Sequence, residues 1–235
     1  MSVNRFEIAL PMICAAPDAL PPQIDAGGAA TVILDIRKDW ATVSAAGEIQ
    51  PILTQGQSVA TCMLFRVRRP DDEAGQTAIE RLLKLRPHGF VLSGCGGATD
   101  IQTFDVMLRV AEARNGIEAG STALVAELGE DAAFLLSLTS LKVVSHRLKA
   151  IIFDGEGVTQ ATASQAFNMA ASRAGAPLLL ARAAAVIKAR QAGIACYELL
   201  KDTDNDPQTT RQIALADGFS GVVARNAAQL AALAG

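Results

Sequence analysis

The chain has 235 residues, of which 50% are hydrophobic, and its 24 acidic and 21 basic side chains give a formal net charge of −3. This composition excludes a disordered chain, and one Trp and one Tyr with a negative net charge exclude a basic, aromatic surface for nucleic acid. Two histidines cannot build a three-histidine metal site, and no GxSxG motif marks a serine nucleophile.

The cysteines and the apolar segments indicate in which cellular compartment the protein is expected. Four cysteines are scattered without CxxC pairs, and at least three fall in expected strands, so we expect buried thiols rather than disulfides and a cytoplasmic location. The N-terminus lacks the basic-then-apolar pattern of a signal peptide, and no run of about 18 apolar residues occurs. We therefore expect a soluble chain without a membrane partner.

Short apolar or β-branched segments alternate with helical patterns from one end of the chain to the other. Most lack polar alternation, so both faces of each predicted strand should be buried, as in a parallel sheet. The predicted strands are Ile8–Cys14, Thr31–Ile36, Thr61–Val67, Gly89–Ser93, Thr122–Glu127, Ala150–Asp154, Ala195–Leu199 and Gly221–Ala224.

Helices are predicted between these strands. Residues 76–86 form one that Pro87 ends, and a capping box of Thr99 and Gln102 opens another that Asn115-Gly116 closes. Residues 207–216 and 226–233 form the last two. Eight strands in 235 residues give about 29 residues per β/α unit, which predicts one (β/α)₈ TIM barrel over residues 1–235. The alternative, an open doubly wound sheet, lacks the phosphate fingerprint after its first strand.

Charged residues gather where the predicted strands end, which is where TIM barrels place their active groups. Asp35, Arg66, Glu127 and Asp154 hold such positions, and Glu156 follows shortly after. Carboxylates there are typical Mg²⁺ ligands, and an arginine there can bind a substrate carboxylate. Each acid could instead cap a helix, and the glycine-rich loop at residues 93–97 could be a tight turn rather than a phosphate cradle.

Four stretches resemble the citrate lyase beta-subunit and HpcH/HpaI-type aldolase family. They are GFVLSGCGGATDIQTFDVMLRVAEARNGIEAG (89–120), RLKAIIFDGEGV (147–158), ARAAAVIKARQAGIACYE (181–198) and DGFSGVVARNAAQL (217–230). The resemblance implies an oligomeric TIM barrel that makes or cleaves carbon–carbon bonds in small oxo- or hydroxy-carboxylic acids or their coenzyme A or acyl-carrier thioesters. It also implies a bound Mg²⁺ that polarises the substrate and an arginine that stabilises the enolate.

The resemblance assigns roles to particular residues. Arg66 matches the catalytic, enolate-stabilising arginine, and Arg5 matches an arginine that holds a substrate carboxylate or phosphate. The fifth-strand metal ligand is Glu127 by strand position or Glu130 by counting back from Arg147. The sixth-strand ligand is Asp154 by strand position, whereas the alignment points to Gly157, immediately after Glu156.

Several family positions carry different residues here. The second-strand acids fall on Arg37 and Lys38, the fourth-strand lysine on Gly94, and the closing lysine and histidine on Val222 and Asn226. Two hypotheses follow. The first is a Mg²⁺-dependent carbon–carbon lyase that acts on a small carboxylic acid or acyl-CoA as a homo-oligomer. The second is a catalytically degenerate paralogue that binds a small anion or a partner subunit without turnover.

Overall fold

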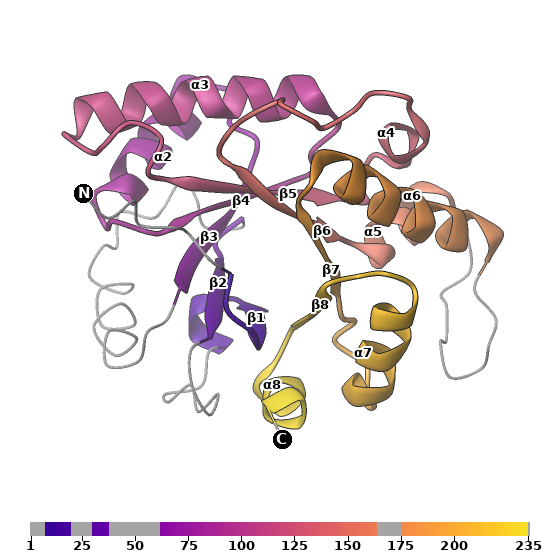
Figure 1. Cartoon of the computed structure of the whole chain (residues 1–235). Coiled ribbons are helices and arrows are strands. Elements are labelled where there is room, and N and C mark those ends of the chain that lie inside the picture. Colours follow the sequence, from indigo (N-terminus) through magenta and orange to yellow (C-terminus); the bar gives the residue numbers. More distant parts are fainter. Residues whose placement is uncertain (1–7, 20–29, 38–61, 164–174, 235) are drawn as a thin grey trace.

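The computed structural model describes residues 8–19, 30–37, 62–163 and 175–234, and in them eight parallel strands close into a barrel. Each strand pairs with the next, and β1 pairs with β8. Figure 1 shows the helices outside the ring of strands, which confirms the predicted (β/α)₈ architecture. The strands are β1 (Met12–Ala15), β2 (Thr31–Asp35), β3 (Cys62–Arg68), β4 (Gly89–Ser93), β5 (Ala123–Leu128), β6 (Leu148–Phe153), β7 (Ala195–Leu199) and β8 (Gly221–Ala224).

The strand bounds agree with the predicted ones within two residues, except at the start of β1. The first strand begins at Met12 instead of Ile8. The side chain of Thr31 satisfies both backbone groups of Ala9, because its hydroxyl accepts from the Ala9 N–H at 3.0 Å and donates to the Ala9 carbonyl at 2.8 Å. This side-chain contact replaces the ladder that would have extended the strand.

The helices begin where side-chain caps place them. A cap by Asp72, which accepts from the Gly75 N–H at 2.8 Å, starts the helix after β3 at Glu73 rather than at 76, and this helix ends at Leu83 rather than at 86. The capping box at Thr99 is wrong, because Gly97 is the N-cap and makes no side-chain cap bond, whereas Asn115 ends that helix as predicted. The helices are α2 (Glu73–Leu83), α3 (Ala98–Arg114), α4 (Ala132–Leu136), α5 (Gly155–Ala161), α6 (Ala176–Ala192), α7 (Pro207–Ala216) and α8 (Ala227–Ala234), with a 3₁₀ turn at Pro17–Ala19.

The core has two layers, since alternate residues of each strand face opposite sides. One set fills the barrel interior, and it includes Met12, Ile33, Leu64 and Val125. The other set packs under the helices, as Phe65 and Phe90 do. All four cysteines are free and buried, as expected, and burial raises each thiol pKa to about 12. In the described segments, no helix is long and apolar enough to cross a membrane.

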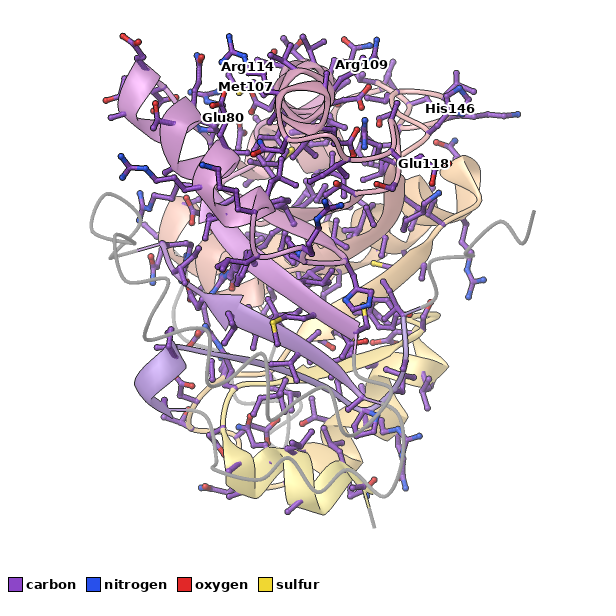
Figure 2. The ribbon with its side chains drawn as sticks, turned by 90° about the vertical axis from the view of Figure 1, so that its left-hand side faces the viewer. Glu80, Met107, Arg109, Arg114, Glu118 and His146 are labelled. Carbon is purple, nitrogen blue, oxygen red and sulfur yellow. The ribbon has the colours of Figure 1, made fainter. Side chains whose placement is uncertain are left out.

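Buried ion pairs join the helices to the barrel. Arg147 donates to both carboxylate oxygens of Glu112 at 2.6 Å and to Asp105 at 2.5 Å. Burial alone would raise the pKa of Glu112, but hydrogen bonds, led by those from Arg147, hold it below its ordinary value. An exposed pair of similar length, Arg114 with Glu80 at 2.5 Å, joins α3 to α2 on the outer surface in Figure 2.

Candidate functional site at the carboxyl end of the barrel

The carboxyl ends of β2, β3 and β5 place three charged side chains inside the barrel. Arg66 lies two residues after Leu64, Glu127 two after Val125 and Asp35 two after Ile33, so period-2 alternation points all three inward. Arg66 pairs in register with Asp35 on the neighbouring strand. Arg66 is only 1% exposed and Glu127 only 2%. These two groups therefore sit in the uppermost layer of the interior.

Arg66 and Glu127 form a two-pronged ion pair across the barrel. The Nε of Arg66 donates to Glu127 Oε2 at 2.6 Å, and its Nη2 donates to Oε1 at 2.5 Å. Burial raises the pKa of Glu127, while the positive charge of Arg66 acts against that rise. Burial would lower the pKa of Arg66, but the charge and hydrogen bonds of Glu127 together with the charge of Asp35 outweigh burial and raise that pKa. The two groups thus compensate each other's charge.

A second arginine extends the pair into a chain of four. The Nη1 of Arg66 donates to Asp35 Oδ2 at 2.7 Å. Arg37 grips the same carboxylate through Nε and Nη2, each at 2.9 Å. Burial would raise the pKa of Asp35, but the bonds from Arg37 and the charge of Arg66 outweigh burial and lower it. The order Arg37–Asp35–Arg66–Glu127 is neutral overall, and we call it the arginine–carboxylate chain.

The other predicted metal ligands have separate partners. Asp154, 8% exposed, caps α5 by accepting from the N–H groups of Glu156 and Gly157 at 3.0 and 3.1 Å. Glu156 pairs with Arg225 at 2.7 Å. Glu130 has a 43% exposed side chain, and its nearest basic contact is Arg37 Nη1 at 3.7 Å.

In the arrangement that the structure describes, these acids are not gathered into a Mg²⁺ site. Within the described ranges, no three histidine, cysteine or acidic side chains are arranged to hold a metal ion. Both oxygens of Glu127 accept from Arg66, so a metal there would compete with the guanidinium, and Asp154 Oδ1 is used by the cap. A divalent cation needs oxygen ligands that are free to turn toward it. The described side chains instead supply arginine where a metal would supply positive charge.

The departures from the family pattern have visible structural roles. Asn226 accepts from the Gln229 N–H at 3.0 Å at the start of α8, and Val222 packs in the outer layer under the helices. A side chain at Gly94 would meet Glu130, since a Cβ there would lie 2.9 Å from Oε2. Arg5 and Lys38 lie outside the described residues.

Two residues of this region carry contacts that the strand-end argument did not assign. Arg37 completes the arginine–carboxylate chain, and the signal for it was the reversal of charge two residues after Asp35. Arg225 joins β8 to Glu156, and its position one residue after β8 was the signal that could have found it.

No family model matches this sequence, and no curated protein matches it. Solved structures do share its fold. Haloferax volcanii malate synthase has a TM-score of 0.71 at 18% identity, covering 95% of this chain and 73% of its own. RipC from Yersinia pestis has a TM-score of 0.63 at 21% identity over 94% of this chain and 93% of its own. The citrate lyase beta subunit of M. tuberculosis, solved with oxaloacetate and magnesium, has a TM-score of 0.64 at 13% identity over 95% and 93%. The resemblance to citrate-lyase-like barrels is thus confirmed at the level of the fold.

Proposed function

We propose that the carboxyl end of this barrel binds a small carboxylic acid without Mg²⁺-dependent carbon–carbon cleavage, so that the chain is a catalytically degenerate relative of citrate-lyase-like enzymes. One observation carries the proposal: both oxygens of Glu127 accept from Arg66. A metal at this carboxylate would compete with the guanidinium for both oxygens, and the charge of this guanidinium is already balanced by a carboxylate rather than left for an enolate. Separating them would leave a buried charge unpaired, at a cost of about 3–5 kcal/mol.

Arg37 is the residue that we assign to the acid ligand. Its side chain is 22% exposed, and Nε and Nη2 stay on Asp35 while Nη1, among the described residues, makes the 3.7 Å contact with Glu130. That contact is longer than a hydrogen bond, so an incoming carboxylate can take Nη1 without breaking the pair with Asp35. The resemblance expects an acid at position 37, and an arginine there favours an anion over a cation.

Calorimetric titration with oxalate and pyruvate tests this function. We expect the same affinity in EDTA as in millimolar Mg²⁺, and no product from oxaloacetate above a protein-free blank. Arg37→Met should weaken oxalate binding by about tenfold or more, which corresponds to the loss of one charge-assisted contact. Arg114→Met, which removes an ion-paired arginine from the outer surface, should leave binding unchanged. Binding that requires Mg²⁺, or turnover in its presence, would refute the proposal.

The second candidate is a Mg²⁺-dependent lyase that acts on a small oxo- or hydroxy-acid, or on its coenzyme A or acyl-carrier thioester. What favours it is that Glu127 and Asp154 end adjacent strands and the charge of Asp154 raises the pKa of Glu127, as two acids close together would. Arg66 would then be the catalytic arginine and Arg5 a second substrate contact, with Glu130 and Glu156 as the alternative ligands. Heat from a Mg²⁺ titration that Glu127→Gln abolishes and Glu130→Gln preserves would support this candidate over the first.

We further propose that the chain forms a cytoplasmic homo-oligomer. The support is an apolar surface on α6, where Leu179, Leu180 and Ile187 are 51%, 55% and 57% exposed. Four free, buried thiols also agree with a reducing compartment. Light scattering measures the mass directly, and a monomer at micromolar concentration would contradict the oligomer.

A further inference from the structure

The turn after β5 brings one more carboxylate to the arginine–carboxylate chain. Glu130 is the second residue after β5, and its backbone lies against the turn that follows β6. A Cβ on Gly157 would lie 3.1 Å from the Glu130 backbone nitrogen, and a Cβ on Gly129 would lie 2.2 Å from the Asp154 carbonyl oxygen. Glycine at both positions allows these close approaches, so the backbone that carries the Glu130 side chain is held in place.

The side chain of Glu130 occupies the space beside Gly94, just after β4. Its Oε2 lies 2.9 Å from the point that a Cβ on Gly94 would occupy. Gly94 has a φ of 63°, a conformation that favours glycine. The lack of a side chain at position 94 therefore leaves room for the Glu130 carboxylate, whose Oε1 faces Arg37 Nη1 at 3.7 Å.

The contact between Glu130 and Arg37 is weak but unfavourable for an acid ligand. Its length exceeds that of a hydrogen bond, and the two side chains are 43% and 22% exposed, so the pair contributes little to stability. The carboxylate nevertheless lies at the nitrogen that we assign to the ligand, and it has the same charge as the ligand. An incoming carboxylate at Nη1 must either displace Glu130 or lie against its charge.

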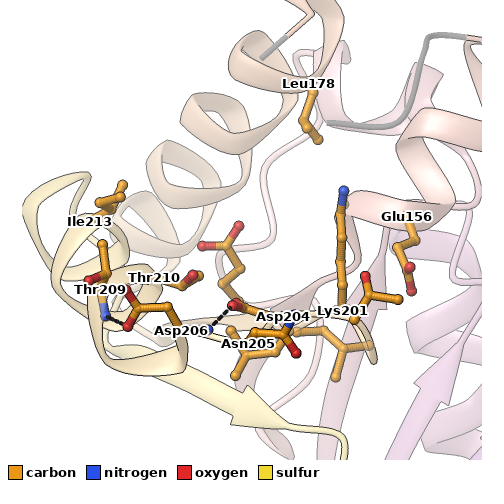
Figure 3. A pocket seen from close by; sticks show the side chains of 14 residues that line it. Glu156, Leu178, Lys201, Asp204, Asn205, Asp206, Thr209, Thr210 and Ile213 are labelled. Carbon is orange, nitrogen blue, oxygen red and sulfur yellow. Dashed lines mark hydrogen bonds between the residues drawn. The ribbon is translucent and has the colours of Figure 1, made fainter. Parts of the chain in front are cut away.

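The other described acids after β5 and β6 do not compete for Arg37 in this way. Glu156 pairs with Arg225 at 2.7 Å and lines another pocket, beside the loop before α7 (Figure 3). Asp154 caps α5 through Oδ1. Since the arginine–carboxylate chain is itself neutral, the charges of Glu130 and Asp154 leave this end of the barrel negative.

We propose that Glu130 is a competing carboxylate, which weakens the binding of acids at Arg37 and selects singly charged acids against doubly charged ones. The inference rests on the proposed function, because it concerns the same ligand at the same arginine. Pyruvate meets Glu130 with one negative charge, whereas oxalate brings a second carboxylate that Glu130 also repels. Repulsion of the wrong ligand is a common source of specificity. Removing the charge of Glu130 therefore favours oxalate more than pyruvate.

Titration calorimetry in EDTA compares the wild type with Glu130→Gln, which removes the charge and keeps the shape of the side chain. We expect the variant to bind pyruvate about threefold more tightly, the size of an exposed ion pair, and oxalate about tenfold more tightly. A disturbed fold would weaken binding, so the expected gain distinguishes a competing charge from a structural role. Glu118→Gln is the control, because it removes one exposed negative charge before β5, at the opposite end of the barrel, and should change neither affinity.

The possible results separate this inference from the function on which it rests. If both acids bind the wild type and lose affinity in Arg37→Met, but bind Glu130→Gln no more tightly, the inference is overturned and the proposed function stands. An equal gain for the two acids, or the same gain in Glu118→Gln, also overturns the selection by Glu130. No binding to the wild type or to Glu130→Gln overturns both, whereas binding to Glu130→Gln alone supports both.

Discussion

Replacing Glu127 by glutamine removes the negative half of the arginine–carboxylate chain with little change of shape. A glutamine oxygen can still accept from Arg66, but its amide group then faces the second N–H donor, so one of the bonds at 2.5 and 2.6 Å is lost. Breaking a buried pair on one side costs about 3–5 kcal/mol, and Arg66 keeps Asp35 at 2.7 Å, so we expect about 3 kcal/mol. For a chain of this size that lowers the Tm by about 6–12 °C.

Urea unfolding followed by circular dichroism measures this loss. Glu80→Gln is the matched control, since its pair with Arg114 has the same 2.5 Å length but is exposed, and it should cost under about 1 kcal/mol. The double variant Arg66→Met, Glu127→Leu should recover most of the loss, because two apolar side chains of similar volume often replace a buried ion pair without penalty. Equal, small losses in Glu127→Gln and Glu80→Gln would refute the view that burial makes this pair structural.

Three further predictions concern the barrel wall and its anchors. Glu112→Gln should cost about 3 kcal/mol at neutral pH. Burial alone would raise the pKa of Glu112, but its hydrogen bonds lower that pKa overall. The carboxylate therefore stabilises the fold fully above pH 4.5, the ordinary pKa, and this stabilisation is lost as the pH falls through the lowered pKa. The variant lacks this contribution, so its Tm should fall less steeply than that of the wild type as the pH is lowered. Gly129→Ala should lower the free energy of unfolding by about 3 kcal/mol, since its Cβ would lie 2.2 Å from the Asp154 carbonyl oxygen. Gly116→Ala, where a Cβ would have no atom within 4 Å and φ is 61°, should lower it by about 1 kcal/mol. Equal losses of stability in urea unfolding would contradict the steric argument. Lys188→Met removes two hydrogen bonds to the carbonyls of residues 137 and 139, at 2.8 and 2.9 Å. The variant should therefore be cut faster by subtilisin in that segment, and an unchanged digestion pattern would rule out an anchoring role.

The strands could be predicted because a parallel barrel buries both faces of each strand, which leaves an apolar segment in the sequence. The inward direction of Arg66 and Glu127 also follows from period-2 alternation along β3 and β5. The choice of partners could not be predicted in the same way. Whether Glu127 turns to Arg66 or to a metal depends on side chains from four strands, and no local pattern in the sequence records that meeting.

Helix starts show the same limit on a smaller scale. The sequence contains several residues that can cap a helix near each start, and tertiary contacts select among them. Asp100 accepts from the Gly96 N–H at 2.8 Å, which leaves Gly97 as the cap and makes Thr99 an ordinary first-turn residue. Asp154 shows the same ambiguity, because an aspartate at a strand end can bind a cation or cap a helix. In the structure it caps α5.

The reaction of the four buried thiols with alkylating reagents reports when the barrel opens. Thiolate is the reactive form of cysteine, and burial raises each thiol pKa to about 12, so alkylating reagents have almost nothing to attack at neutral pH while the barrel is closed. Cys14 and Cys62 face the interior, whereas Cys95 and Cys196 lie under the helices. The order in which reagents reach them therefore separates loosening of the helical layer from rupture of the ring of strands.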